Sequence, residues 1–135
     1  MISNVYPAST AILFFRVGTG AGPTYQSGAS DYSWSAKSSS DASDSQIDLG
    51  LAQEATGADA GVGSAITLVL SQPANSTIQT QIDWNGLVYG SLNRIERNYG
   101  VGQYNSDTAV TAVRFLYSTG NITAGTISMY GVSTS

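Results

Sequence analysis

The sequence contains neither cysteine nor histidine among its 135 residues. Disulfide bonds are therefore impossible, and the usual ligands of zinc and other transition metals are missing. The cysteine and histidine nucleophile arrangements and the common general base near neutral pH are missing as well. These absences exclude the most familiar catalytic centres, so we expect a protein that is not an enzyme and that uses no cofactor and no metal.

Charge is also scarce, because charged residues make up 10% of the chain against about 25% in an average soluble domain. The five basic residues are dispersed, so they form no stripe that could bind nucleic acid. No apolar run is long enough to span a bilayer, and no signal peptide is visible. We therefore expect neither nucleic acid nor membrane as a partner. A weakly charged surface suits a protein packed against others, although a Ser/Thr-rich monomer would have the same composition.

What is present is 41% hydrophobic residues, including eight tyrosines, three phenylalanines and two tryptophans, in short runs separated by glycine. Helical periodicity is nowhere sustained over three turns. The pattern predicts an all-β fold, an antiparallel, jelly-roll-like β-sandwich of about eight to ten short strands. Residues 10–135 should form this single domain, and residues 1–9 should form an N-terminal arm.

Alternating patterns place the expected strands at residues 10–17, 30–37, 46–52, 65–72 and 109–118. Asn85-Gly86 between two β-like runs predicts a hairpin with a type I′ turn, and residues 113–131 predict a second hairpin. Residues 38–45 and 53–64 read as loops, and residues 97–108 as an irregular strand or bulge. The expected core includes the following residues: Ile12, Phe14, Trp34, Leu49, Leu68, Ile82, Phe115 and Ile127.

Few residues suggest chemistry. Asp41, Asp44 and Asp48 are spaced unlike a calcium-binding EF-hand loop, so we expect a solvated acidic loop there. No two carboxylates are marked as a glycosidase pair among the following: Asp31, Asp48, Glu54, Asp83 and Glu96. Glycines 18, 20 and 22 lack the helix that a phosphate cradle requires. Asn75 and Asn121 match the glycosylation acceptor pattern but are also typical turn residues.

Aromatic residues offer two interpretations. They could stack on sugar rings, or they could serve the core and subunit contacts, which is the commoner use of large aromatic side chains. The aromatic residues in question are Tyr25, Tyr32, Trp34, Trp84, Tyr89, Tyr99 and Tyr104. The candidate subunit or capsid interface combines some of these with the N-terminal arm: Ile2, Val5, Tyr6, Pro7, Tyr25, Tyr89, Tyr99 and Tyr104.

The run "AVRFLYSTGNITAGTISMYGV" resembles a C-terminal signature in small structural modules of tailed bacteriophages and gene transfer agents. "VGTGAGPTYQSGASDYSWSA" is similar to the other half of the same pattern, and the match covers nearly the whole chain. The resemblance implies a virion structural protein, usually a β-sandwich that forms homotrimers, and it brings no catalytic constellation.

Within that group the resemblance does not choose a position on the virion. Residues forming a long shaft or heptads are missing, which favours a capsid decoration, or cement, protein over a tail fibre. We expect such a protein to bind the major capsid protein on the capsid exterior and to stabilise the shell. The alternative is a receptor- or glycan-binding module of a tail fibre or head fibre, with a host surface glycan as its partner.

Overall fold

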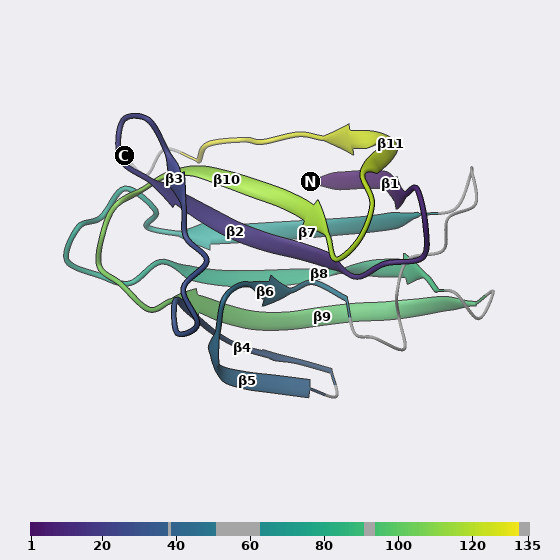
Figure 1. Ribbon diagram of the computed structural model, residues 1–135, viewed down its shortest axis with the longest axis horizontal. Helices are drawn as coiled ribbons and strands as arrows, with labels where there is room; N and C mark the ends of the chain where they lie inside the picture. The colour runs from purple at the N-terminus through teal and green to yellow at the C-terminus, as the bar shows by residue number, and fades with distance from the viewer. Residues whose placement is uncertain (38, 51–62, 91–93, 133–135) are drawn as a thin grey trace.

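The computed structural model describes residues 1–37, 39–50, 63–90 and 94–132. Within these ranges the chain forms strands, turns and loops, and it contains no helix that could cross a membrane. The strands form two antiparallel sheets packed as a sandwich (Figure 1), which confirms the predicted all-β class. The large sheet has the order β11 (Ile122–Ile127), β1 (Ile2–Pro7), β7 (Ser64–Ser71), β8 (Gln81–Tyr89), β9 (Ile95–Tyr104), β4 (Tyr32–Ala36) and β5 (Ser39–Asp44).

The small sheet is built around β2 (Leu13–Thr19). One edge of β2 pairs along its whole length with β10 (Val110–Tyr117). Its other edge pairs with two short strands, β3 (Thr24–Tyr25) and β6 (Ile47–Asp48). Because β1 lies beside β11 in one sheet and β2 beside β10 in the other, the two ends of the chain roll together from sheet to sheet, as in a jelly roll.

The core lies between the sheets and follows the alternation of the strands. On β2 the buried side chains are Leu13, Phe15 and Val17, while Arg16 points away from the core. On β8 they are Ile82 and Trp84, and the ring of Trp84 is 1% exposed. The Trp84 Nε1 donates a 2.9 Å hydrogen bond to the side-chain oxygen of buried Asn98, whose amide nitrogen donates to the Leu49 carbonyl. Asn98 thus fixes the segment after β6 against β9.

Two tyrosine hydroxyls connect the sheets. The hydroxyl of Tyr32 on β4 accepts a hydrogen bond from the backbone nitrogen of Val17 on β2, at 2.9 Å. The hydroxyl of Tyr117 on β10 donates to the carbonyl of Val5 on β1, at 3.0 Å. Burial raises the pKa of Tyr32 to about 12, so the hydroxyl keeps its proton and can donate to Gln26.

The predicted turn at Asn85-Gly86 is wrong. Both residues lie inside β8, paired without a register shift to Thr67 and Ile66 on β7 and to Tyr99 and Asn98 on β9. The hairpin between β8 and β9 exists, but its turn follows Tyr89, where the Gly90 nitrogen donates to the Arg94 carbonyl. Glycine is needed at position 86 for a different reason, since a Cβ atom there would lie 2.7 Å from the Ile66 Cα.

Three further segments differ from expectation. The expected polar loop at residues 38–45 contains β5, an exposed strand that pairs with β4 and needs few apolar residues because it covers no core. The expected irregular segment 97–108 contains most of β9, which pairs with β8 without a register shift. The expected C-terminal hairpin is not one, because β10 and β11 belong to different sheets. Residues 51–62 lie outside the described residues. This range includes most of the loop expected at residues 53–64 and the end of the strand expected at residues 46–52.

The N-terminal arm is also a correction. Residues 2–7 form β1 inside the large sheet, and the side chains of Ile2 and Val5 are only 2% and 1% exposed. Apolar residues at a chain end that reach a sheet are held there by ladder hydrogen bonds and by burial, so they are not free to leave it.

The expected core is partly right. Trp34, Leu49 and Ile82 are buried, and Leu68 and Phe115 are partly buried against the core. Ile12 and Phe14 are only half-buried, because the opposite face of β2 points inward. Ile127 is 45% exposed, since β11 lies at the sheet edge.

Candidate functional site

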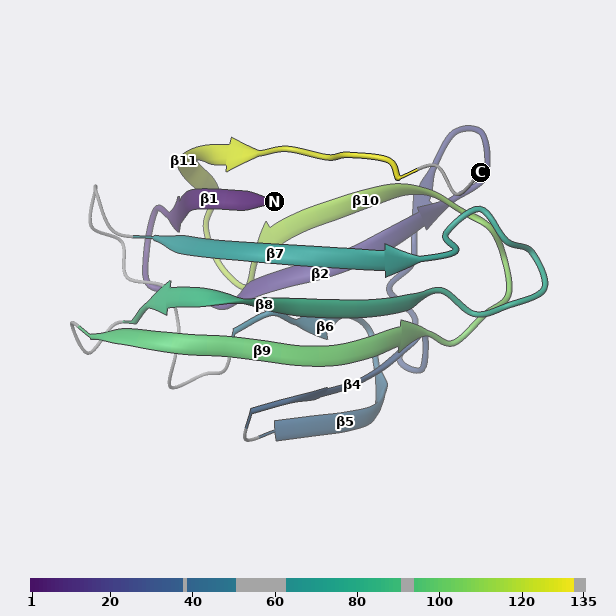
Figure 2. The same cartoon turned by 180° about the vertical axis from the view of Figure 1, so that it is seen from behind.

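An area with several exposed apolar side chains lies on the outward side of β7, β8 and β9, the front layer in Figure 2. We call it the outer face, and its main members are Val69, Asp83, Leu87, Tyr99 and Val101. Val69, Asp83 and Val101 are direct cross-strand neighbours. The two valines are 52% and 55% exposed, although β-branched side chains at such positions usually pack against a second layer. The outer face therefore offers contact area to a partner.

A groove of about 700 Å³ lies where the outer face meets β4 and β5. Its lining combines apolar surface with hydroxyl and amide groups and two carboxylates, from the following residues: Ser33, Trp34, Ser35, Ser40, Asp41, Ala42, Ser71, Gln81, Ile82, Asp83, Val101, Gly102 and Gln103. Serine hydroxyls and glutamine amides can donate and accept hydrogen bonds in several directions. Such a lining suits a neutral, hydroxyl-rich ligand.

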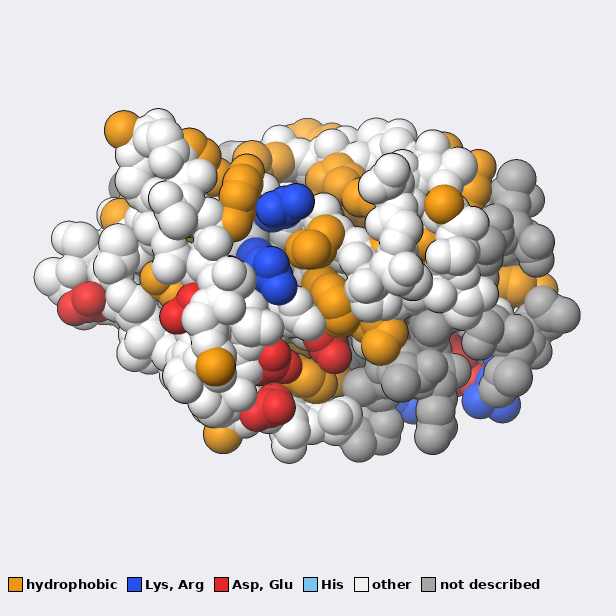
Figure 3. All heavy atoms as spheres, viewed as in Figure 1, with side chains coloured by type: hydrophobic (Ala, Val, Ile, Leu, Met, Phe, Trp, Pro, Cys, Tyr) orange, Lys and Arg blue, Asp and Glu red, His pale blue; other side chains and the backbone are white. Residues whose placement is uncertain are grey.

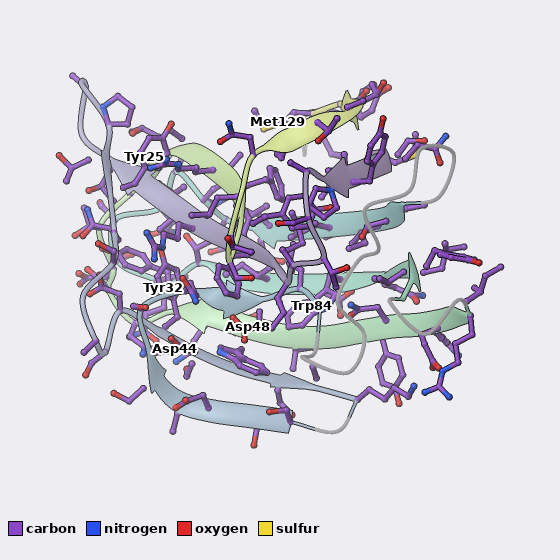
Figure 4. All side chains as sticks on the ribbon, turned by 45° about the vertical axis from the view of Figure 1, so that its right-hand side comes forward. Tyr25, Tyr32, Asp44, Asp48, Trp84 and Met129 are labelled. Carbon is purple, nitrogen blue, oxygen red and sulfur yellow. The ribbon has the colours of Figure 1, made fainter. Side chains whose placement is uncertain are left out.

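A second exposed region is formed by β11 and the segment 128–132, which we call the C-terminal edge. Every residue of β11 is exposed, and Met129, Tyr130 and Val132 are 78%, 77% and 91% exposed. Met129 lies at the top of Figure 4, on the opposite side of the molecule from Asp44. No charged side chain occurs between positions 118 and 132.

The outward side of the small sheet carries a different chemistry. Arg16 on β2 and Arg114 on β10 are direct cross-strand neighbours. The Arg16 guanidinium donates to the Gln46 side chain at 2.8 Å, and the Arg114 guanidinium lies 5.4 Å from the centre of the Tyr25 ring. Figure 3 shows basic and acidic side chains gathered close together on this face. These mutual contacts give the arginines a structural use within the chain.

The three aspartates considered for calcium do not form a metal site. Among the described residues, no group of three or more metal-ligating side chains is found. Asp44 accepts hydrogen bonds from the Trp34 Nε1 at 3.0 Å and from the Ser45 nitrogen, and Asp41 accepts one from the Ser43 nitrogen. The carboxylates of Asp41 and Asp44 are thus used to hold the chain around β5.

Asp48 gives a test of this part of the structure. Its pKa is raised from 3.8 to about 6, mainly by burial and in part by the nearby Asp44 and Asp41 carboxylates, against the lowering effect of a hydrogen bond from Gln46. The folded protein thus holds this proton more tightly than the unfolded chain does. We expect the free energy of unfolding to fall as the pH rises from 3.8 to about 6, and to be independent of Asp48 above that range.

Denaturant melts of the wild type and of Asp48→Asn between pH 4 and 7 would check this. The substitution should flatten the pH profile and should stabilise the protein at neutral pH. Asp83→Asn is the matched control, because it makes the same substitution at an exposed position of the outer face. Parallel profiles for wild type and Asp48→Asn would contradict the burial of a charged Asp48.

The structure separates the residues of the candidate interface. Ile2, Val5, Pro7 and Tyr104 are buried in the chain itself, so in this fold they are not available to a subunit or capsid contact. Tyr6 and Tyr89 are half-buried. Tyr25 and Tyr99 are exposed, but they lie on different sheets and each ring is covered by an arginine, Arg114 or Arg97.

The other candidates have local structural uses. Asp31 accepts a hydrogen bond from the Gly28 nitrogen, and Glu96 is held by Lys37 and Arg94. Asn75 lies in a turn and accepts from the Thr77 nitrogen at 2.8 Å. At Asn121 the positive φ of the turn belongs to the preceding Gly120. Glycines 20 and 22 form the turn between β2 and β3. Glu54 lies outside the described residues.

Sequence reasoning missed the outer face, although the signal was present. In β7, Val69 lies between Leu68 and Leu70, which face the core. An apolar residue at an outward position of an alternating strand predicts an exposed apolar side chain. No protein-family model, curated protein or solved structure matches the chain. Functional proposals therefore rest on the outer face, the groove, the C-terminal edge and the sequence resemblance.

Proposed function

We propose that this chain is a non-enzymatic virion structural protein, a capsid decoration or cement protein that binds the major capsid protein on the capsid exterior. The sequence resemblance to small phage structural modules supports the virion setting. The observation that carries the binding role is the outer face, with Val69, Leu87 and Val101 exposed on three adjacent strands. Exposed apolar side chains spread over three strands fit a broad contact with a protein surface.

The chemistry of the outer face indicates how such a contact would be stabilised. Stable interfaces bury about 800 Å² on each partner, with an apolar centre and a polar rim. Here the exposed valines and Leu87 would form the centre, and the serines and glutamines of β4, β8 and β9 would form the rim. Because few charged groups are available to pair, binding should depend weakly on salt.

The experiment adds the purified protein to capsids assembled without it, from the virus whose genome encodes the chain. We expect the temperature of capsid disruption to rise, both in low salt and in 0.5 M salt. The double variant Leu87→Asp/Val101→Asp should weaken capsid binding by at least about tenfold, a loss of about 1.4 kcal/mol. Ala21→Asp/Gly22→Asp, at an exposed turn on the small sheet, adds the same two charges as the matched control and should bind normally. Unchanged capsid stability would contradict the proposal.

The groove favours one second candidate, a glycan-binding module of a tail fibre or head fibre. Its hydroxyl and amide lining can pair with sugar hydroxyls, and two carboxylates can accept from them. Binding of purified host surface glycan that is lost in Gln81→Ala/Gln103→Ala, together with no effect on capsids, would favour this candidate. Retained glycan binding in that variant would exclude the groove as the site.

A further inference from the structure

The strand β11 is an edge that the fold leaves open. It pairs with β1 on one side, and within the described residues no strand pairs with its other side. All six of its residues are exposed, so its side chains can be reached as well as its outer backbone edge. An open edge presents unpaired N–H and C=O groups, which are a template for another strand.

Two common protections of an open edge, charge and proline, are missing from β11, although its ladder with β1 contains register shifts. Natural edge strands carry charges, inward-pointing polar groups or proline. From Ser118 to Val132 the chain has no charged side chain and no proline, and β11 instead contains the β-branched residues Ile122, Thr123, Thr126 and Ile127. The opposite edge of the same sheet, β5, does carry such protection, since it contains Asp41 and Asp44. The two edges of one sheet are therefore treated differently.

We propose that two copies of this chain pair through β11, antiparallel across a two-fold axis, so that their large sheets form one continuous sheet. This proposal goes beyond the capsid role and does not depend on it. A two-fold contact uses the same surface on both partners and closes after two copies. Because the contact is made through the edge strand β11, the outer face of each copy stays exposed on the joined sheet.

The distribution of charge favours a second copy as the occupant. The chain has a net charge of −4, and repulsion between copies would oppose contact through an acidic surface. Pairing through β5 would bring Asp41 and Asp44 of two copies together. Pairing through β11 avoids this, because six inter-strand spacings separate β11 from β5, about 29 Å at 4.8 Å each and about three Debye lengths.

Symmetry limits the register of such a pair. Directly opposed residues of an antiparallel ladder point to the same face of the sheet. A two-fold axis perpendicular to the sheet also keeps each side chain on its face. One residue of β11 must therefore lie opposite its own copy, with a Cα to Cα distance of about 4.5 or 5.5 Å. The residues on either side of it lie about 8 Å from their own copies, because each is displaced along both strands.

The lack of cysteine makes this register measurable. Single cysteines are placed in turn at Ile122, Thr123, Ala124, Thr126 and Ile127, and each full-length variant is oxidised at micromolar concentration. Disulfides need Cα atoms within about 7 Å, so we expect one position alone to form a covalent dimer efficiently. If the axis falls on Gly125, which is left unchanged because a Cβ there would meet Val5, a mixture of the Ala124→Cys and Thr126→Cys chains forms the mixed dimer instead.

Ser40→Cys on β5 is the control, since it is equally exposed but lies on the acidic edge, and it should remain monomeric after oxidation. Equal cross-linking at all positions including Ser40, or none at any position and none in the mixture, would overturn the proposal.

Sedimentation equilibrium of the wild type gives an independent measurement. We expect a dimer of twice 14.0 kDa in place of the trimer that the sequence resemblance implies. Thr123→Lys/Thr126→Lys should shift the equilibrium to the monomer by at least about a hundredfold in dissociation constant, while Ser40→Lys should not. Circular dichroism melts report whether each variant is folded, which is expected because these side chains are exposed. A wild-type monomer or trimer, or a dimer unaffected by the β11 lysines, would overturn the proposal.

Discussion

Replacing Trp84 with alanine is expected to lower the free energy of unfolding by about 4 kcal/mol, within the range for large aromatic residues in protein cores. The side chain is 1% exposed and lies between the sheets (Figure 4), so its removal leaves a cavity. The substitution also removes the donor that Asn98 accepts from at 2.9 Å. A buried acceptor without a donor adds about 1–3 kcal/mol to the cost.

Urea melts followed by circular dichroism would measure this loss. Leu87→Ala is the matched control on the same strand, because Leu87 is 40% exposed on the outer face and should cost less than about 1 kcal/mol. Trp84→Phe separates the two causes, since it keeps most of the apolar volume and removes only the donor. Similar losses for Trp84→Ala and Leu87→Ala would mean that β8 does not present the Trp84 side to the core.

The substitution Gly86→Ala should lower the free energy of unfolding by about 2–3 kcal/mol or more, because an added Cβ overpacks a closed site. That atom would lie 2.7 Å from the Ile66 Cα and would also meet the Ala65 carbonyl oxygen on β7. Backbone atoms held in a ladder cannot move aside as the end of a side chain can. The strands β7 and β8 would have to separate locally.

The neighbouring residue distinguishes this cause from a turn. In a type I′ turn, Asn85 would need a positive φ, and Asn85→Thr would be strongly unfavourable. In the exposed strand position that Asn85 occupies, threonine should leave stability unchanged or raise it. Gly22→Ala is the control for glycine itself, since nothing lies within 4 Å of the added Cβ. Stability lost in Asn85→Thr but kept in Gly86→Ala would contradict the strand.

The sandwich could be predicted because alternating strands carry their own signal. On β7, the alternation correctly indicates which side chains face the core between the sheets, namely Ile66, Leu68 and Leu70. The failures arise where the pairing partner, and not the local sequence, decides the structure. β5 is a strand because β4 offers it a ladder, and Asn85-Gly86 is extended because β7 and β9 hold it on both sides.

The candidate surfaces were harder to predict for a related reason. Tyr104 and Tyr99 are both tyrosines of β9, yet one is 5% and the other 44% exposed, since they differ in parity along the strand. The composition indicated a surface poor in charge but could not place it. The exposure of β11 depends on its position at the edge of the large sheet, which no local pattern encodes.

The pairing of the first strands with the last has a consequence for the growing polypeptide. During synthesis, β1 and β2 leave the ribosome first, but their neighbours β11 and β10 are made more than ninety residues later. Ladders between residues so distant in sequence form slowly. Neither sheet can be completed until the last strands have emerged, so one backbone edge of β1 and one of β2 stay without their partner strands until β11 and β10 have been made. A chain released early would carry those edges as sites of aggregation.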